Sequence, residues 1–222
     1  MQCLPVHTFK DAQSRRVTPS SGTGIGLSEA FPATTTDAGA VGFVLALIGR
    51  CEKPLLWVQD RLSQRESGRP YLPGLRDAPP IIRVDLSQPI DVLWAMEEGL
   101  RCGALAGVIG EVWGDPAALS FTATKRLALR AEAMGLPCWL LRRATAPNLS
   151  AARNRWRVSS LPSAPHPHDA RAPGGPRWDV ELFRSRHMKP GRWVAHHDPA
   201  RNQLDMSPWQ SDGAAPPLRA VG

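Results

Sequence analysis

The sequence lacks a long apolar segment and contains few cysteines. Its longest apolar run is ten residues, 40–49, whereas a helix that spans a bilayer needs about 20, so we expect no membrane contact. The first ten residues do not combine a basic start with an apolar stretch, as a secretory signal does, which favours a cytoplasmic chain. The four cysteines lie far apart in the sequence, a spacing more typical of reduced thiols than of a disulfide framework or a zinc site.

The composition is that of an ordinary globular protein. The 222 residues are enough for about one domain with an appendage. Hydrophobic residues make up 42% and charged residues 21%, which argues against a chain that is disordered throughout. We expect a disordered lead at 1–20, a core at 21–160, a Pro-rich loop with a basic β-hairpin at 161–200, and a disordered tail at 201–222.

Short apolar runs alternate with helical patterns along the predicted core. Helices are predicted at 37–50, 90–102 and 121–134, and strands at 27–31, 55–59, 81–85, 105–110 and 136–141. This alternation predicts an α/β fold with right-handed crossovers and a mainly parallel sheet with flanking helices. Beyond the core, 178–182 and 192–196 alternate with period two and predict an antiparallel hairpin.

The loop between the first strand and the first helix is where an α/β protein binds phosphate. A P-loop needs two glycines, a lysine and a hydroxyl residue at fixed spacing. On that template the four positions hold Thr34, Gly39, Ala40 and Val41, so three of the four requirements fail. No lysine lies between residues 11 and 52 to replace the missing one. We therefore expect a degenerate P-loop, no cofactor and no enzymatic activity.

Other candidate sites carry weaker signals. Glu111 ends a predicted strand, where a carboxylate of an active NTPase would hold the metal through water. Without the lysine, a solvated side chain is the favoured interpretation. His166 and His168 lie in a Pro-rich loop, and the adjacent His196 and His197 would point to opposite faces of a strand, so no metal site is expected.

The excess positive charge lies in the C-terminal part. Residues 142–201 hold 12 basic and 4 acidic residues, a net of +8, while the remaining 15 basic and 16 acidic residues sum to −1. Arginine favours bidentate contacts, so this segment is a candidate for binding single-stranded DNA or an acidic protein surface. An ordinary solvated face is the alternative. The candidate residues are Arg153, Arg155, Arg157, Arg184, Arg186 and Arg192.

Several segments of the chain resemble the ImuA family. The specific part is the stretch WAMEE at 94–98, LRCGALA at 100–106, VIGE at 108–111 and WG at 113–114. Softer similarity covers roughly 25–198 and includes 27–31, 56–59, 124–133, 176–182 and 190–193. ImuA is a RecA-like, SulA-related protein encoded in bacterial damage-inducible mutagenesis cassettes.

The resemblance implies a RecA-like core that serves as a partner-binding scaffold, with Ala40 and Val41 where RecA keeps its lysine and hydroxyl. It implies action with ImuB, a catalytically inactive Y-family polymerase homologue, with an error-prone C-family DNA polymerase, and with RecA. Together these would copy damaged template during the SOS response. A SulA-like inhibitor of cell division and a weak RecA-type ATPase are the alternatives. Whether DNA is touched directly or only through partners stays open.

Overall fold

The computed structural model describes residues 25–75, 78–166, 168–169, 171–198 and 200–209. The predicted lead at 1–20 and the part of the predicted tail beyond 209 lie outside these residues. The described residues form one nine-stranded sheet in the order β3-β2-β4-β5-β1-β6-β7-β8-β9. The strands are β1 (Gly26–Pro32), β2 (Leu55–Asp60), β3 (Ile81–Leu86), β4 (Gly107–Trp113), β5 (Pro137–Arg143), β6 (Asn154–Leu161), β7 (Arg177–Ser185), β8 (Gly191–Asp198) and β9 (Gln203–Pro208).

The sheet has a parallel and an antiparallel part. Strands β3, β2, β4, β5, β1 and β6 are parallel neighbours, and β6 to β9 pair antiparallel. The structure therefore confirms an α/β protein with a large mixed sheet. The predicted hairpin is also confirmed, since Trp178 of β7 pairs with Ala195 of β8. It is not a separate appendage, because β6 joins it to the parallel strands.

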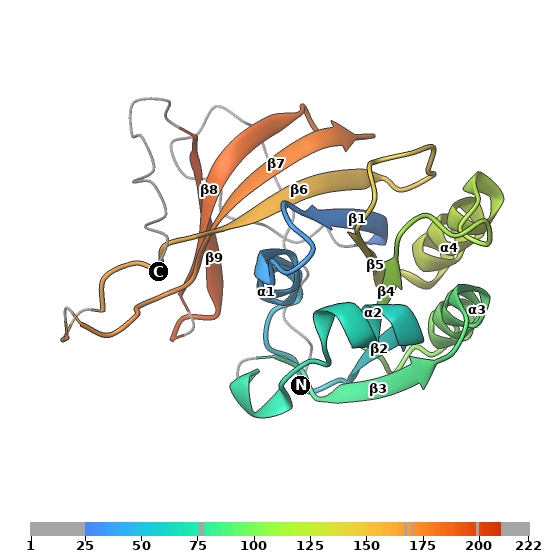
Figure 1. The fold of residues 1–222 in the computed structure, drawn as a ribbon, viewed down its shortest axis with the longest axis horizontal. Coiled ribbons are helices and arrows are strands. Elements are labelled where there is room, and N and C mark those ends of the chain that lie inside the picture. The colour runs from blue at the N-terminus through green and yellow to red at the C-terminus, as the bar shows by residue number, and fades with distance from the viewer. Residues whose placement is uncertain (1–24, 76–77, 167, 170, 199, 210–222) are drawn as a thin grey trace.

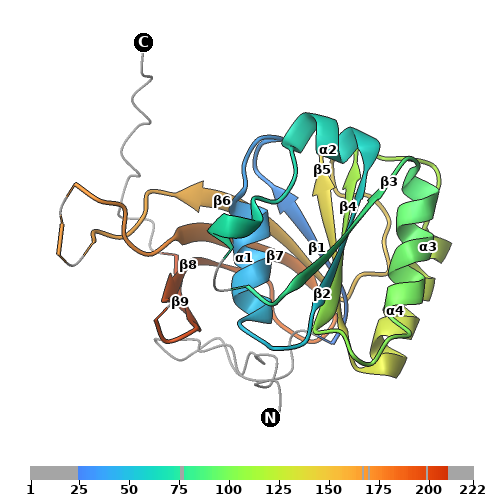
Figure 2. The same cartoon turned by 90° about the horizontal axis from the view of Figure 1, so that it is seen from below.

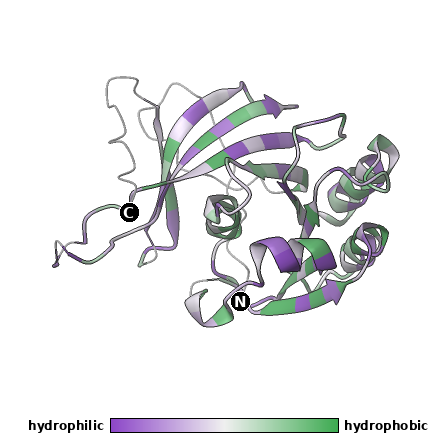
Figure 3. Ribbon diagram, in the orientation of Figure 1, coloured by the Kyte–Doolittle hydropathy of each residue, from purple (hydrophilic) through white to green (hydrophobic). Residues whose placement is uncertain are grey.

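Helices cover both faces of the parallel part (Figure 1). They are α1 (Gly39–Ile48), α2 (Arg61–Ser67), α3 (Pro89–Gly99) and α4 (Phe121–Met134). One hydrophobic core lies between α1 and the sheet and continues under β6 to β9, where Trp156 and Trp178 are buried. The second core lies under α3 and α4, on the opposite face. Figure 3 shows the resulting alternation of hydrophobic and hydrophilic residues along β6, β7 and β8, which is typical of strands with one face in a core.

Local sequence explains where the helices begin and end. Ser120 caps α4 by accepting a hydrogen bond from the Ala123 N–H at 3.2 Å, and Gly135 ends that helix in the left-handed conformation with φ of 64°. Helix α3 packs closely on β4 because Gly110 has no side chain. A Cβ at Gly110 would collide with the Met96 side chain, which is fully buried. The two residues come from the WAMEE and VIGE segments, so these motifs meet in the core.

Two expectations from the sequence need correction. The predicted tail is wrong for 203–208, which form β9 with Leu204 and Met206 buried. So short a strand with two apolar residues has a weak signal by itself, and its stability depends on pairing with β8. Cys102 and Cys138 are free thiols, but Cys51 is disulfide-bonded, so the prediction of reduced thiols is wrong for Cys51.

Candidate functional site

The candidate site lies at the carboxyl ends of the parallel strands, where open α/β sheets bind their ligands. Figure 2 shows the ends of β1, β4 and β5 together at one edge, beside α2. The loop from β1 to α1 reaches the same edge and carries Thr34, and α1 begins with Gly39, Ala40 and Val41, the other positions compared above with a P-loop. Thr34 is exposed in this loop, while Gly39 and Ala40 are buried in the first turn of α1 and Val41 is half-buried.

The carboxylate of Asp37 lies at the first turn of α1. Its Oδ1 accepts hydrogen bonds from the Gly39 N–H at 2.7 Å and from the Ser160 hydroxyl at 2.6 Å, and its Oδ2 accepts one from the Ser160 N–H at 2.9 Å. A helix N-terminus attracts anions through its free N–H groups and its dipole. The anion at this helix terminus is therefore part of the chain.

Gly39 is also enclosed by this arrangement. A Cβ at Gly39 would lie 2.8 Å from the Ser160 hydroxyl oxygen and 2.9 Å from Asp37 Oδ1. Glycine at this position thus makes room for the chain's own carboxylate and hydroxyl. In a P-loop, the equivalent glycine allows the backbone to wrap a phosphate.

The guanidinium of Arg143, at the end of β5, is hydrogen-bonded to the same loop. Its Nη1 donates to the backbone carbonyls of Thr35 and Asp37, each at 2.9 Å, and its Nε donates to Glu111 Oε1 at 2.8 Å. The side chain is 5% exposed. Carbonyl oxygens of the loop therefore face a buried cation, whereas a phosphate cradle presents N–H groups to an anion.

Glu111 is the acceptor at the centre of the cluster. Its Oε1 accepts the hydrogen bond from Arg143, and its Oε2 accepts hydrogen bonds from the Gln59 amide at 2.6 Å and the Trp57 indole at 3.4 Å. The residue is 1% exposed, so the expectation of a solvated carboxylate is wrong. The error arises because the partners of Glu111 come from β2 and β5, at sequence distances that a local pattern does not show.

A cavity of about 290 Å³ opens beside this cluster. Glu111, Arg143 and Gln59 line one side of it, and Val41 and Tyr71 line others. The lining is mainly apolar, with the charged pair already engaged in hydrogen bonds.

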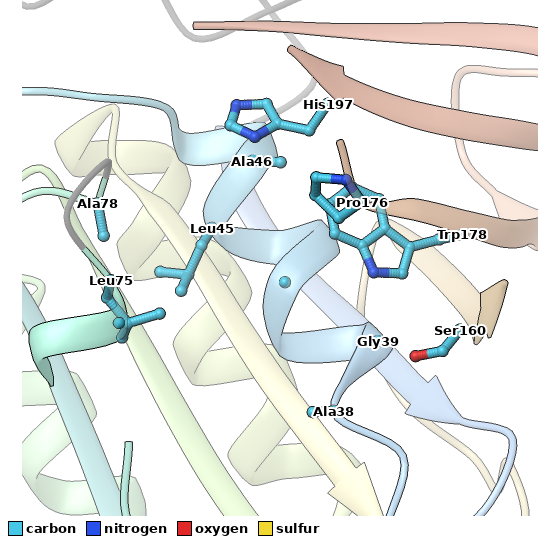
Figure 4. A pocket seen from close by; sticks show the side chains of 12 residues that line it. Ala38, Gly39, Leu45, Ala46, Leu75, Ala78, Ser160, Pro176, Trp178 and His197 are labelled. Carbon is cyan, nitrogen blue, oxygen red and sulfur yellow. The ribbon is translucent and has the colours of Figure 1, made fainter. Parts of the chain in front are cut away.

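A second cavity, of about 380 Å³, lies between α1 and the strands β7 and β8 (Figure 4). Small residues of α1 face it, and Trp178 and Pro176 approach from the other side. A Cβ at Gly42 would lie 2.8 Å from the Trp178 ring, so this glycine allows the indole to pack against the helix.

A second buried charge cluster lies on the other face of the sheet. Glu29 of β1 is fully buried and accepts hydrogen bonds from Arg155 Nε at 2.7 Å and the Ser150 hydroxyl at 2.8 Å. Arg142 Nη1 lies 3.6 Å from Glu29 Oε1, and both guanidinium groups stack over the Phe31 ring. Burial lowers the pKa of Arg142, and the carboxylate of Glu29 opposes that shift. This cluster links β1, β5 and β6 and is a structural element of the sheet.

The six arginines proposed from the sequence as a binding patch lie on or next to β6, β7 and β8, but most are paired within the chain. Arg155 is 3% exposed and bonded to Glu29. The other pairs are Arg153 with Glu132, Arg157 with Glu181 at 3.0 Å, and Arg192 with Asp179 at 2.5 and 2.8 Å. Arg184 and Arg186 are exposed, and within the described part of the chain neither forms an ion pair.

The remaining candidates do not assemble into a site. Among the residues that the structure describes, no group of three or more His, Cys, Asp or Glu could hold a metal ion. The described helices also include none long and apolar enough to cross a membrane.

Two curated proteins are similar to this chain over most of its length. Both are named Protein ImuA and come from two strains of Caulobacter vibrioides. Each is 31% identical over 190 residues, which cover 78% of this chain and 71% of the relative. The sequence matches no protein-family model.

Proposed function

Because this chain belongs to the ImuA family, we propose that it is a non-catalytic accessory protein, or scaffold, of the SOS-induced translesion DNA synthesis complex. In this proposal it acts with ImuB, an error-prone C-family DNA polymerase and RecA in damage-induced mutagenesis. The sheet and the β1–α1 connection support a RecA-like core, since the loop after β1 reaches the edge where such cores bind nucleotide.

The observation that carries the non-catalytic assignment is the Asp37 carboxylate at the first turn of α1. A phosphate at the same place would meet this negative charge. Two unit charges 4 Å apart repel by about 4 kcal/mol at an effective dielectric constant of about 20. The favourable interaction of an anion with a helix N-terminus is about 0.3–1 kcal/mol. Repulsion outweighs attraction, so a triphosphate would bind only if Asp37 moved away.

The Arg143 contacts support the same assignment. This cation would be the natural candidate to replace the missing P-loop lysine, but Glu111 and two loop carbonyls already use its donors. Releasing it would leave the buried Glu111 carboxylate without its charged partner, which is costly in a protein interior. The cluster therefore acts as a structural bond between β4, β5 and the loop.

The cellular test is deletion of this chain from a host that carries the complete mutagenesis cassette. We expect mutation frequency after ultraviolet exposure to fall to the undamaged level, with growth in the absence of damage unchanged. The wild-type chain should restore induced mutation, and so should the matched variants Thr34→Ala and Val41→Ala, since neither residue binds nucleotide in this proposal. Unchanged mutation after deletion would contradict it.

The biochemical test separates a scaffold from an ATPase. The purified chain should show no saturable turnover of ATP with magnesium, and it should co-purify with ImuB from damaged cells. Saturable turnover would support the weak ATPase instead. Filamentation of undamaged cells on overexpression, without an effect on mutation, would support an inhibitor of cell division.

A further inference from the structure

Helices α3 and α4 carry several exposed apolar side chains. The two helices lie side by side on one side of the parallel strands (Figures 1 and 2). They supply five of the eleven exposed large hydrophobic side chains in the described residues. These five are Ile90, Trp94, Phe121, Leu129 and Met134. We call this surface the α3–α4 face.

Trp94 is the most prominent of these side chains. It is 65% exposed, and Ile90, one helical turn earlier, is 62% exposed. On α4, Leu129 is 52% exposed. Large exposed apolar side chains close together are typical of interaction surfaces, and tryptophan is enriched among residues that dominate binding energy.

The charges around the apolar residues differ in sign between the two helices. Helix α3 carries Asp91, Glu97 and Glu98, of which Glu98 pairs with Arg101 at 3.6 Å. Helix α4 carries Lys125, Arg126, Arg130 and Glu132, of which Glu132 pairs with Arg153. Arg126 bridges to Glu97 at 2.6 Å and thereby joins the two helices. Asp91, Lys125 and Arg130 form no ion pair within the described part of the chain. The unpaired charges are therefore acidic on α3 and basic on α4, and we call the two helices the acidic half and the basic half of the face.

We propose that the α3–α4 face binds a second copy of this chain through a twofold axis that runs parallel to the two helices, between the copies. Such a rotation places α3 of one copy opposite α4 of the other, twice in the same interface. Each acidic half then meets a basic half, and Trp94 of each copy packs against Leu129 of its partner. A twofold axis perpendicular to the helices would instead place acid on acid and base on base.

Charge complementarity is what selects a second copy as the occupant. A face with separate acidic and basic halves is complementary to itself after the parallel rotation, so no other protein is needed to match its charges. Like charges across an interface are destabilising and suppress wrong pairings. The interface uses none of the residues around the β1–α1 loop, such as Asp37, Glu111 and Arg143. The test of the dimer is therefore independent of the test of the proposed scaffold function.

The first test measures the mass of the full chain by sedimentation between about 1 and 100 μM, the range of ordinary specific associations. We expect a concentration-dependent dimer for the wild type and a monomer for Trp94→Ser. The matched control Tyr71→Ser removes a side chain that is 74% exposed and lines the cavity beside Val41 of α1, on the face of the sheet opposite α3 and α4, and it should leave the dimer unchanged. A wild-type monomer throughout, or a dimer that survives Trp94→Ser, would overturn the proposal.

A charge exchange gives a sharper test. One double variant, Asp91→Lys with Glu98→Lys, makes both helices basic, and another, Lys125→Glu with Arg130→Glu, makes both acidic. Each alone should be monomeric because like charges meet in its homodimer. Mixed one to one, they should form a heterodimer, since every α3–α4 contact then joins opposite charges. A mixture that stays monomeric while both variants are folded by circular dichroism would overturn the proposal.

Discussion

The Asp37 carboxylate accepts a hydrogen bond from the Gly39 N–H at 2.7 Å, so helix α1 begins on an anion that belongs to the chain. The same carboxylate holds Ser160 at the end of β6, 123 residues away. The loop that would bind phosphate in a nucleotide-binding protein is thus tied to the sheet. The Asp37 carboxylate therefore connects the first turn of α1 to β6.

Asp37→Ala should destabilise the protein by about 0.5–2 kcal/mol, the usual loss when a side-chain acceptor at a helix N-terminus is removed, because it leaves the N–H groups of Gly39 and Ser160 without their acceptor. Urea denaturation measures the change in the free energy of unfolding. Asp37→Asn is the control: it keeps one side-chain oxygen acceptor and should lose less. Identical urea midpoints for wild type and Asp37→Ala would show that the hydrogen bonds of Asp37 contribute nothing to the free energy of unfolding.

The Glu111–Arg143 pair should behave as a buried ion pair, since its side chains are 2% and 5% exposed. Removing one charge leaves the other buried alone, which costs about 3–5 kcal/mol. We expect Glu111→Gln and Arg143→Met to unfold at much lower urea concentration. The double variant should lose less than the sum of the two single losses, and a double-mutant cycle measures the difference. Strictly additive losses would mean that the pair does not interact.

Much of the fold was predictable because its signals are local. The apolar run at 105–110 and the periodic pattern at 121–134 correspond to β4 and α4, and Gly135 ends the helix as the sequence suggests. Helix α1 is shorter than the predicted 37–50, because Asp37 serves as an acceptor before the first turn and Gly49 ends the helix with φ of 71°. Both ends of α1 therefore depend on single residues, which the periodicity of apolar residues does not take into account.

The candidate site was less predictable because its partners are distant in the sequence. The missing P-loop residues were visible, but nothing local to Asp37 indicates Ser160, and nothing local to Glu111 indicates Arg143. Helix α2 and strand β6 were also not predicted. In β6 charged residues alternate with Trp156 and Val158, a pattern that predicts exposed arginines. Arg155 is nevertheless buried, because Glu29 and Phe31, which are distant in the sequence, contact its guanidinium group.

The ion pair between Glu132 and Arg153 predicts a pH dependence. The hydrogen bond from Arg153 lowers the pKa of Glu132 below its ordinary value of 4.5, against a smaller opposing effect of burial. A carboxyl group whose pKa is lowered on folding stabilises the fold at any pH above its ordinary pKa. This stabilisation is lost as the pH falls through the lowered pKa. The stability difference between wild type and Glu132→Gln should therefore be present at about pH 7 and shrink below 4.5. A difference that is independent of pH would contradict this account. Arg153→Met should weaken the same pH dependence and leave only the smaller effects of Arg186 and His187 on the pKa of Glu132.

Arg184 and Arg186 should dominate any binding to single-stranded DNA. Both are exposed and form no ion pair within the described residues, whereas Arg157 and Arg192 are each bonded to a carboxylate. Each arginine that contacts a phosphate of single-stranded DNA changes the slope of log K against log salt by about 0.7. Arg184→Ala with Arg186→Ala should reduce the magnitude of that slope by about 1.4, and Arg157→Ala with Arg192→Ala by clearly less. Fluorescence anisotropy with a thymidine oligonucleotide between about 50 and 200 mM salt measures it. Equal effects of the two double variants would contradict the assignment.

Gly42 in α1 tests whether helix propensity or packing decides stability at the contact with Trp178. In a helix interior, alanine is favoured over glycine by about 1 kcal/mol. Here the added Cβ would lie 2.8 Å from the Trp178 ring, and overpacking of a core costs about 1–3 kcal/mol. Because Trp178 is 5% exposed and also contacts the Phe43 ring, it has little room to move, so Gly42→Ala should be destabilising. In the background of Trp178→Phe the smaller ring removes the clash, and the same substitution should become stabilising. Thermal or urea denaturation of the wild type, Gly42→Ala, Trp178→Phe and the double variant measures both effects. A stabilising Gly42→Ala in the wild-type background would mean that the Trp178 indole moves aside at little cost in free energy.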